Sequence, residues 1–168
     1  MLKPTRMLVL GLAVGAICVA AAPANAETLT KAQVIKRGSA ICRAAEARVD
    51  GIPGPRSENP FAKTAPQGDK ARALKFIAVY ASSLESVRTG LGQLAAVAPP
   101  EGRSLLTSFV RQLGPTVAAF RSGHSAALAR HYGLALDDVQ RGFTLFARAS
   151  ARTRAYGFPH GVCQSGSS

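Results

Sequence analysis

Apolar residues recur at steps of three and four positions along four segments of the chain, which is the pattern of amphipathic helices. The first segment spans about 30–49 and opens with Thr30 and Gln33, the Thr-x-x-Gln pair of a helix capping box. The second spans about 69–97, with Asp69 as its expected N-cap. No segment alternates apolar and polar positions as a strand does, so the pattern predicts an all-α fold.

The third segment starts near Glu101 and is expected to close at Ser122 and Gly123. Pro115 lies inside this segment. Because proline removes one backbone hydrogen bond and its ring clashes with the preceding turn, we expect a kink or a break there.

The fourth segment keeps one apolar phase over about 124–156, and this phase passes through Gly133 unchanged. We therefore expect one long continuous helix. The alternative is a break at Gly133, with Asp137 capping a second helix. Gly157 is well placed as the residue that ends the segment. The expected apolar stripe comprises Leu128, Tyr132, Ala135, Val139, Phe143, Phe146, Ser150 and Thr153.

Residues 51–68 connect the first two helices, and prolines and glycines occupy 7 of these 18 positions. Such a stretch cannot form a helix, although Phe61 is a candidate anchor to the core. The second and third connections are short. Four amphipathic helices joined in this way predict an up-down-up-down four-helix bundle.

Residues 1–26 have the three parts of a secretory signal peptide. Lys3 and Arg6 supply its positive start, an almost uninterrupted apolar run follows, and a small-x-small triplet ends at Ala26. We expect cleavage between Ala26 and Glu27. The apolar run has about 16 residues, which is fewer than the ~20 that span a bilayer.

Cleavage there predicts a protein that is secreted or held in the cell envelope, with no transmembrane segment left in the mature chain. Its helical domain would cover 27–163, and the Gln-Ser-Gly-Ser-Ser tail at 164–168 is expected to be disordered. The alternatives are an uncleaved N-terminal anchor and a lipoprotein modified at Cys18.

The mature chain would contain two cysteines, Cys42 and Cys163. An even number of cysteines in an exported chain indicates a disulfide. The end of a fourth helix lies near the start of the first in such a bundle, and the seven residues after Tyr156 can span the remaining distance at ~3.3 Å each. Two free thiols are the alternative.

Two motifs flank this domain: the segment Ala40-Ile41-Cys42-Arg43-Ala44-Ala45 near its start, and Tyr156-Gly157-Phe158 followed by Val162-Cys163 at its end. With these motifs the chain resembles a group of uncharacterised exported helical proteins of actinobacteria, which share an early "ICRAA" segment and a late "YG…VC" segment. The resemblance implies a four-helix bundle with a Cys–Cys link, and it implies no activity.

The strongest compositional bias is basic, with a formal net charge of +12 that falls to +10 once Lys3 and Arg6 leave with the signal peptide. Four arginines are expected on one stripe of the last helix, opposite its apolar face: Arg130, Arg141, Arg148 and Arg152. This stripe is a candidate anion-binding surface for an envelope polymer or lipid. A merely solvated face is the alternative. The stripe lacks interleaved aromatic residues, so we expect no specific nucleic-acid binding.

No catalytic, cofactor or metal motif stands out, so an enzyme is the less favoured class. Two further functions stay open as alternatives. Arg88, three residues after Glu85, could line a cavity for a carboxylate substrate in a small helical enzyme. A carrier of an apolar ligand or of haem is the other, with His131 and Tyr132 as candidate iron ligands.

Overall fold

The computed structural model describes residues 28–159 and 163, and this part of the chain contains helices and no strand. The predicted signal peptide at 1–26, its cleavage site between Ala26 and Glu27, and the tail at 164–168 lie outside the described residues. The all-α prediction is confirmed for the described part. The helices are α1 (Lys31–Asp50), α2 (Asp69–Val97), α3 (Pro100–Leu128) and α4 (Tyr132–Tyr156).

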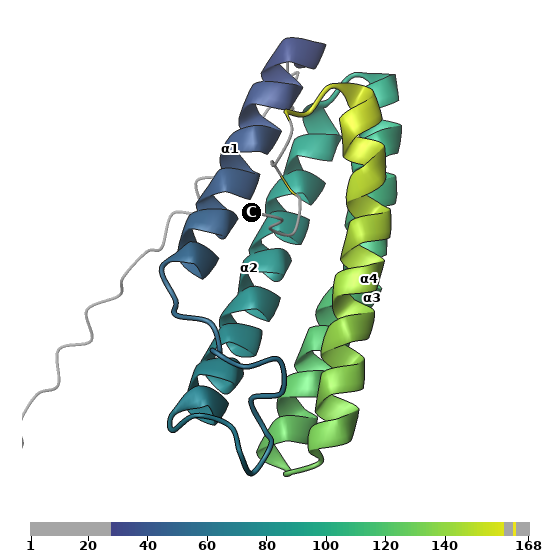
Figure 1. The fold of residues 1–168 in the computed structure, drawn as a ribbon. Helices are drawn as coiled ribbons and strands as arrows, with labels where there is room; N and C mark the ends of the chain where they lie inside the picture. Colours follow the sequence, from purple (N-terminus) through teal and green to yellow (C-terminus); the bar gives the residue numbers. More distant parts are fainter. Residues whose placement is uncertain (1–27, 160–162, 164–168) are drawn as a thin grey trace, which may run out of the picture.

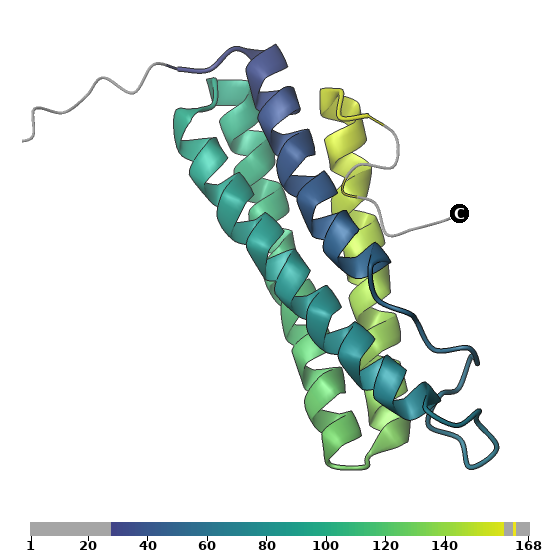
Figure 2. The same cartoon turned by 90° about the vertical axis from the view of Figure 1, so that its left-hand side faces the viewer.

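The three longer helices lie side by side along their whole length, whereas α1 is shorter and packs mainly on α2 (Figures 1 and 2). The amide of Leu29 donates to the carbonyl of Val97 at 2.8 Å, which ties the start of α1 to the end of α2. α1 therefore covers one end of the bundle, and the connector covers the other end (Figure 2).

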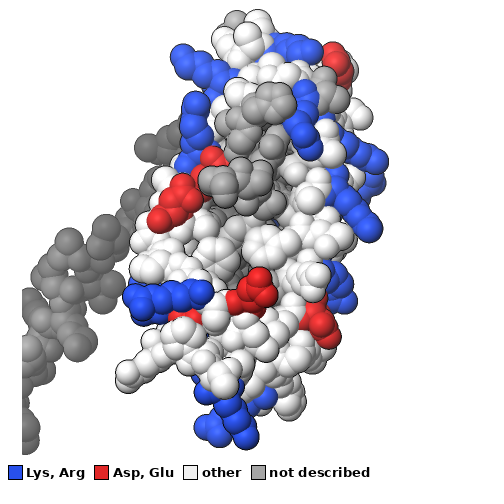
Figure 3. Space-filling view, viewed as in Figure 1, with Lys and Arg blue, Asp and Glu red and all other residues white. Residues whose placement is uncertain are grey.

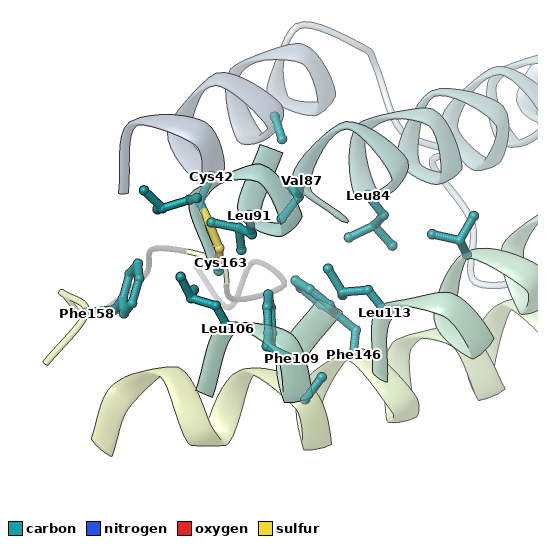
Figure 4. Packing of buried hydrophobic residues seen from close by; sticks show 14 of the residues in the cluster. Cys42, Leu84, Val87, Leu91, Leu106, Phe109, Leu113, Phe146, Phe158 and Cys163 are labelled. Carbon is teal, nitrogen blue, oxygen red and sulfur yellow. A yellow bond between two sulfur atoms is a disulfide. The ribbon is translucent and has the colours of Figure 1, made fainter. Parts of the chain in front are cut away.

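The interior is filled by leucine and phenylalanine side chains from α2 and α3 (Figure 4). Leu91, Leu106, Phe109, Leu113 and Phe120 are all fully buried. Full burial of one such side chain stabilises the fold by ~1.5–3 kcal/mol, so these few positions carry much of the packing energy.

The N-terminus of α1 has the predicted capping box. The amide of Gln33 donates to Oγ1 of Thr30 at 3.3 Å, and the amide of Thr30 donates to Oε1 of Gln33 at 2.8 Å. This reciprocal pair satisfies two amides that have no partner inside the helix.

The prediction that Asp69 is the N-cap of α2 is wrong. Gly68 holds that position with a positive φ of 83°, and Asp69 is the first helical residue. Its buried carboxylate instead binds the connector: Oδ2 accepts from the amides of Arg56 and Ser57 at 3.0 and 2.9 Å and from the Ser57 hydroxyl at 2.8 Å. Arg72 donates to Oδ1 at 2.8 Å.

The connector is not helical, as predicted, and Phe61 does anchor it. The ring of Phe61 stacks on Tyr132 at the start of α4, with the two ring centroids 5.0 Å apart and the planes within 3°. Phe61 also packs against the buried core. The connector is thus held at Asp69 by hydrogen bonds and at Phe61 by packing.

The expected single helix over 124–156 is wrong, and so is the expected end of the third helix at Ser122 and Gly123. α3 continues to Leu128, a turn follows, and α4 begins at Tyr132. Arg130 adopts a positive φ of 64°, the His131 amide donates to the Ala126 carbonyl, and the Arg130 amide donates to that of Ala127. These bonds form a Schellman motif, in which Arg130 takes the left-handed position usually held by glycine.

Gly123 lies inside α3 at a point where α4 packs closely against it. A Cβ atom at Gly123 would lie 3.0 Å from the Ala135 carbonyl oxygen and from Val139. Leu128, expected on the apolar stripe, is 62% exposed at the turn, while Ser150 and Thr153 are buried as expected.

α3 passes through Pro115 without a break. Pro115 is exposed, so its ring and the backbone hydrogen bond that it removes fall on the outer side of the helix. Thr116, the next residue, is fully buried and its hydroxyl donates to the Gln112 carbonyl at 3.1 Å.

Candidate functional site

The C-terminal segment folds back from α4 onto α1. Gly157 ends α4 with a φ of 105°, as predicted, and the buried ring of Phe158 then packs over Gly38. The predicted disulfide between Cys42 and Cys163 is confirmed, with Cα atoms 5.1 Å apart (Figure 4). Sulfur therefore joins α1 to the far end of the chain.

Next to this disulfide lies a cavity of about 80 Å³ between α1, α2 and α4. Most of its wall is apolar, and the polar contributions come from a few groups on α1 and α2. Its apolar lining consists of Cys42, Ala45, Val49, Leu84, Val87, Phe146 and Cys163; its polar lining consists of Glu46, Asp50, Tyr80 and Ser83.

Charges are unevenly placed around this cavity. Figure 3 shows acidic side chains over the lower part of α1 and further acidic side chains lower on the same face, while lysine and arginine line the outer edge beyond α4. Two acids line the cavity, Glu46 and Asp50, and we call them the acidic rim. This rim is contrary to the overall charge, because the chain as a whole carries 21 basic against 9 acidic residues.

The carboxylate of Glu46 belongs to this rim, and its Oε1 accepts a 2.9 Å hydrogen bond from the amide of Cys163. Burial raises the pKa of Glu46 above its ordinary value and outweighs the opposing effect of that hydrogen bond; Asp50 raises the pKa further and Arg43 lowers it. Burial and the nearby Glu46 also raise the pKa of Tyr80. Glu46 is thus an incompletely compensated negative charge beside the cavity.

The second candidate surface is the outer face of α3 and α4. Arg141, Arg148 and Arg152 are exposed on α4, as predicted. Arg130 is also exposed, but it lies in the turn before α4, so its predicted place on the same helical stripe is wrong.

Sequence analysis missed the contribution of α3 to this surface, which is the exposed pair Arg103 and Arg111. Arg152 joins the two helices, since its Nη1 donates to the Ser108 hydroxyl at 3.0 Å. The sequence has no acid between Glu101 and Asp137 and none after Asp138. We call the five residues Arg103, Arg111, Arg141, Arg148 and Arg152 the arginine face.

One arginine of this face is paired with an acid. Arg141 donates to the carboxylate of Asp138 at 2.7 Å, and Asp138, which is only 5% exposed, also accepts from the Ser122 hydroxyl. The side chain of Arg141 is 62% exposed, so its guanidinium also remains accessible to an anion in solvent.

Arg88 lies on the surface of α2 and donates to Glu85 at 2.5 Å, and Arg121 from α3 approaches the same carboxylate at 3.7 Å. The Glu85 hydrogen bond raises the pKa of Arg88. Arg88 is not part of the cavity lining described above. It belongs to a surface ion cluster that links α2 to α3.

His131 precedes α4 in the turn and is exposed, whereas Tyr132 is half-buried. The hydroxyl of Tyr132 accepts a hydrogen bond from Nζ of Lys70, and its ring is stacked on Phe61. These contacts make Tyr132 part of the connector's attachment. Over residues 28–159 and 163, no group of three or more metal-ligating side chains comes together.

Comparisons with protein-family models, with curated proteins and with solved structures gave no match. Within the described residues, none of the four helices combines the length and the apolar character needed to cross a bilayer. The candidate sites therefore rest on the geometry of this chain alone.

Proposed function

We propose that this is an exported up-down-up-down helical bundle that binds an anionic component of the cell envelope through its arginine face. We also propose that it belongs to the group of exported actinobacterial helical proteins that share the "ICRAA" and "YG…VC" motifs. The observation that carries the function is the gathering of five exposed arginines on two adjacent helices, where they outnumber the three acids of those helices, Glu101, Asp137 and Asp138.

Arginine is suited to this task because its planar guanidinium binds phosphate and carboxylate oxygens through paired hydrogen bonds. The face is built on two packed helices, so the spacing of its charges is set by the bundle. A polymer or a lipid surface with repeated anionic groups matches such an extended cationic face better than a single small anion does.

Binding to vesicles of anionic phospholipid, and separately to a soluble polyphosphate, tests the proposal and distinguishes a lipid from a polymer. Reversing Arg141, Arg148 and Arg152 to Glu should weaken binding by about a hundredfold or more, since each cation near an anionic surface contributes roughly 1 kcal/mol. Binding of the unaltered protein should also weaken steeply with added salt.

A matched control reverses three exposed lysines on other parts of the bundle, Lys36, Lys63 and Lys75, which changes the net charge by the same amount. If both triple variants lose affinity equally, net charge alone drives binding and the arginine face is not a site. Absence of binding to either anion at low salt would also refute the proposal.

A further inference from the structure

The cavity beside the disulfide has an apolar interior of a size that suits a short alkyl chain. Its volume is about 80 Å³. An engineered protein cavity of ~150 Å³ holds one benzene molecule, so this one has room for about three to five carbon atoms. Ala45, Val49 and Leu84 are among the aliphatic side chains that would contact such a chain.

A buried hydroxyl in the cavity wall has no partner. Ser83 is 3% exposed, and its Oγ makes no hydrogen bond within the described residues. Leaving a buried polar group unpaired costs ~1–3 kcal/mol, which is the reason such groups are rare in folded proteins. Because Ser83 lines the cavity, a polar ligand group entering it would supply the missing partner.

The acidic rim favours a positively charged ligand. Glu46 and Asp50 are one helical turn apart on α1, and both line the cavity. Asp50 is also the last residue of α1, where the helix dipole places a partial negative charge. The cation that acts on Glu46 from the same helix is Arg43, and it does not line the cavity.

We propose that this cavity binds a short primary alkylammonium ion, with its alkyl chain among Ala45, Leu84 and Phe146 and its ammonium group at Glu46 and Asp50. An ammonium has three N–H donors and no acceptor, which fits the two carboxylates and the unpaired hydroxyl oxygen of Ser83 in the same cavity lining. Binding places a positive charge beside the poorly compensated Glu46, so the ligand gains from a charge that folding has already partly desolvated.

The test titrates n-butylammonium into the protein purified with its disulfide formed, and follows the amide NMR signals of residues around the cavity. The expected result is saturable shifts at Glu46, Ser83 and Cys163, with affinity at least tenfold higher than for butyrate, which has the same apolar chain and the opposite charge. Equal binding of the two ions, or no saturable shift at these residues, would overturn the proposal.

Two variants localise the binding. Glu46→Gln keeps an oxygen for the Cys163 amide but removes the charge, and it should weaken n-butylammonium binding tenfold or more. Ala45→Leu fills the cavity from α1 and should abolish saturable binding. The matched control is Glu58→Gln, an exposed acid of the connector that does not line the cavity, and it should bind as the unaltered protein does.

Far-UV circular dichroism of each variant separates loss of the site from loss of the fold. If folded Glu46→Gln binds n-butylammonium as tightly as Glu58→Gln, the carboxylate does not recognise the ligand and the proposal fails. Binding of Nα-acetyl-lysine amide without binding of n-butylammonium would point to a polypeptide partner and would likewise overturn it.

Discussion

The two ends of this bundle are closed by different means. At one end α1 and the C-terminal segment are joined by the disulfide between Cys42 and Cys163, which are 121 residues apart. At the other end the connector is held by the buried carboxylate of Asp69, which binds residues only 12 and 13 positions earlier. The first closure is covalent and distant in sequence, and the second is non-covalent and local.

Chain entropy explains the difference. The cost of closing a loop grows with the logarithm of its length, so a 121-residue loop costs about 2 kcal/mol more to close than a 12-residue loop. A few hydrogen bonds to one carboxylate are sufficient for the shorter loop. The longer closure also borders the cavity.

Removing the disulfide should have the largest effect. Cys42→Ser combined with Cys163→Ser should lower the free energy of unfolding by about 4–5 kcal/mol, because the unfolded chain regains the entropy of a long loop. Chemical denaturation measures this loss. Hydrogen exchange should increase in α1 and leave the connector protected; an equal increase in both would show that the two closures are not independent.

Removing the carboxylate of Asp69 should have the next largest effect. Asp69→Asn deprives Arg72 of its ionic partner and weakens the bonds to Arg56 and Ser57, so the melting temperature should fall by several degrees. Exchange should now increase in the connector while α1 stays protected. Asn59→Ala, which removes a hydrogen bond between an exposed side chain and the Phe61 amide, is the control and should have little effect.

The stability contributed by the Asp69 carboxylate should depend on pH. Burial raises the pKa of Asp69, but the hydrogen bonds from Ser57, Arg56 and Arg72 outweigh burial and hold the pKa below its ordinary value of 3.8. The charged form therefore stabilises the fold fully above about pH 4, and this contribution is lost as the pH falls through the folded-state pKa. Thermal melts should show the difference between the unaltered protein and Asp69→Asn shrinking at acid pH; a constant difference would contradict it.

Gly38→Val should destabilise the disulfide end more moderately. A Cβ atom at Gly38 would lie 2.6 Å from the ring of Phe158, so the ring must move off α1. Overpacking of this kind costs about 1–3 kcal/mol, measured by denaturation. Gly114→Val, at a glycine of α3 with open space around it, is the control for β-branching in a helix. If Gly38→Val and Gly114→Val lower the free energy of unfolding equally, contact with Phe158 adds no cost of its own.

Phe61→Ala should have the smallest effect, about 1–2 kcal/mol, because Phe61 is only half-buried and a fully buried phenylalanine contributes about 3–5 kcal/mol. The loss should be visible as faster exchange in the connector. Leu128→Ala removes a side chain of similar class that is 62% exposed, and it should change stability by no more than about 0.5 kcal/mol. A larger loss for Leu128→Ala would contradict the assignment of Phe61 as the anchor.

Local sequence predicted several features well because the contacts that form them are local. The Thr30–Gln33 capping box, the span of α2 and the ending of α4 at Gly157 each depend on a few neighbouring residues. The cysteine pair was predicted from the parity of cysteines in an exported chain and from bundle geometry, and the structure confirms the pair.

The turn between α3 and α4 escaped prediction for a physical reason. Glycines usually mark such a turn, but Gly123 and Gly133 are both helical here, and the left-handed position is held by Arg130. The apolar phase of the segment is the same on both sides of the turn, so periodicity could not reveal it. Gly123 instead allows α4 to pack closely against α3 after the chain reverses.

The cavity also escaped prediction, although Glu46 follows Cys42 by one helical turn and could have marked the same face. Its walls come from three helices, and the unpaired hydroxyl of Ser83 is visible only when they are assembled. The sequence by itself determined that the chain is helical, that Thr30 and Gln33 cap α1 and that α4 ends at Gly157, because neighbouring residues encode these features. The cysteine pair followed from the number of cysteines in the expected mature chain. Tertiary structure alone decided which charges meet across helices and where space is left between them, because those depend on contacts between residues far apart in the chain.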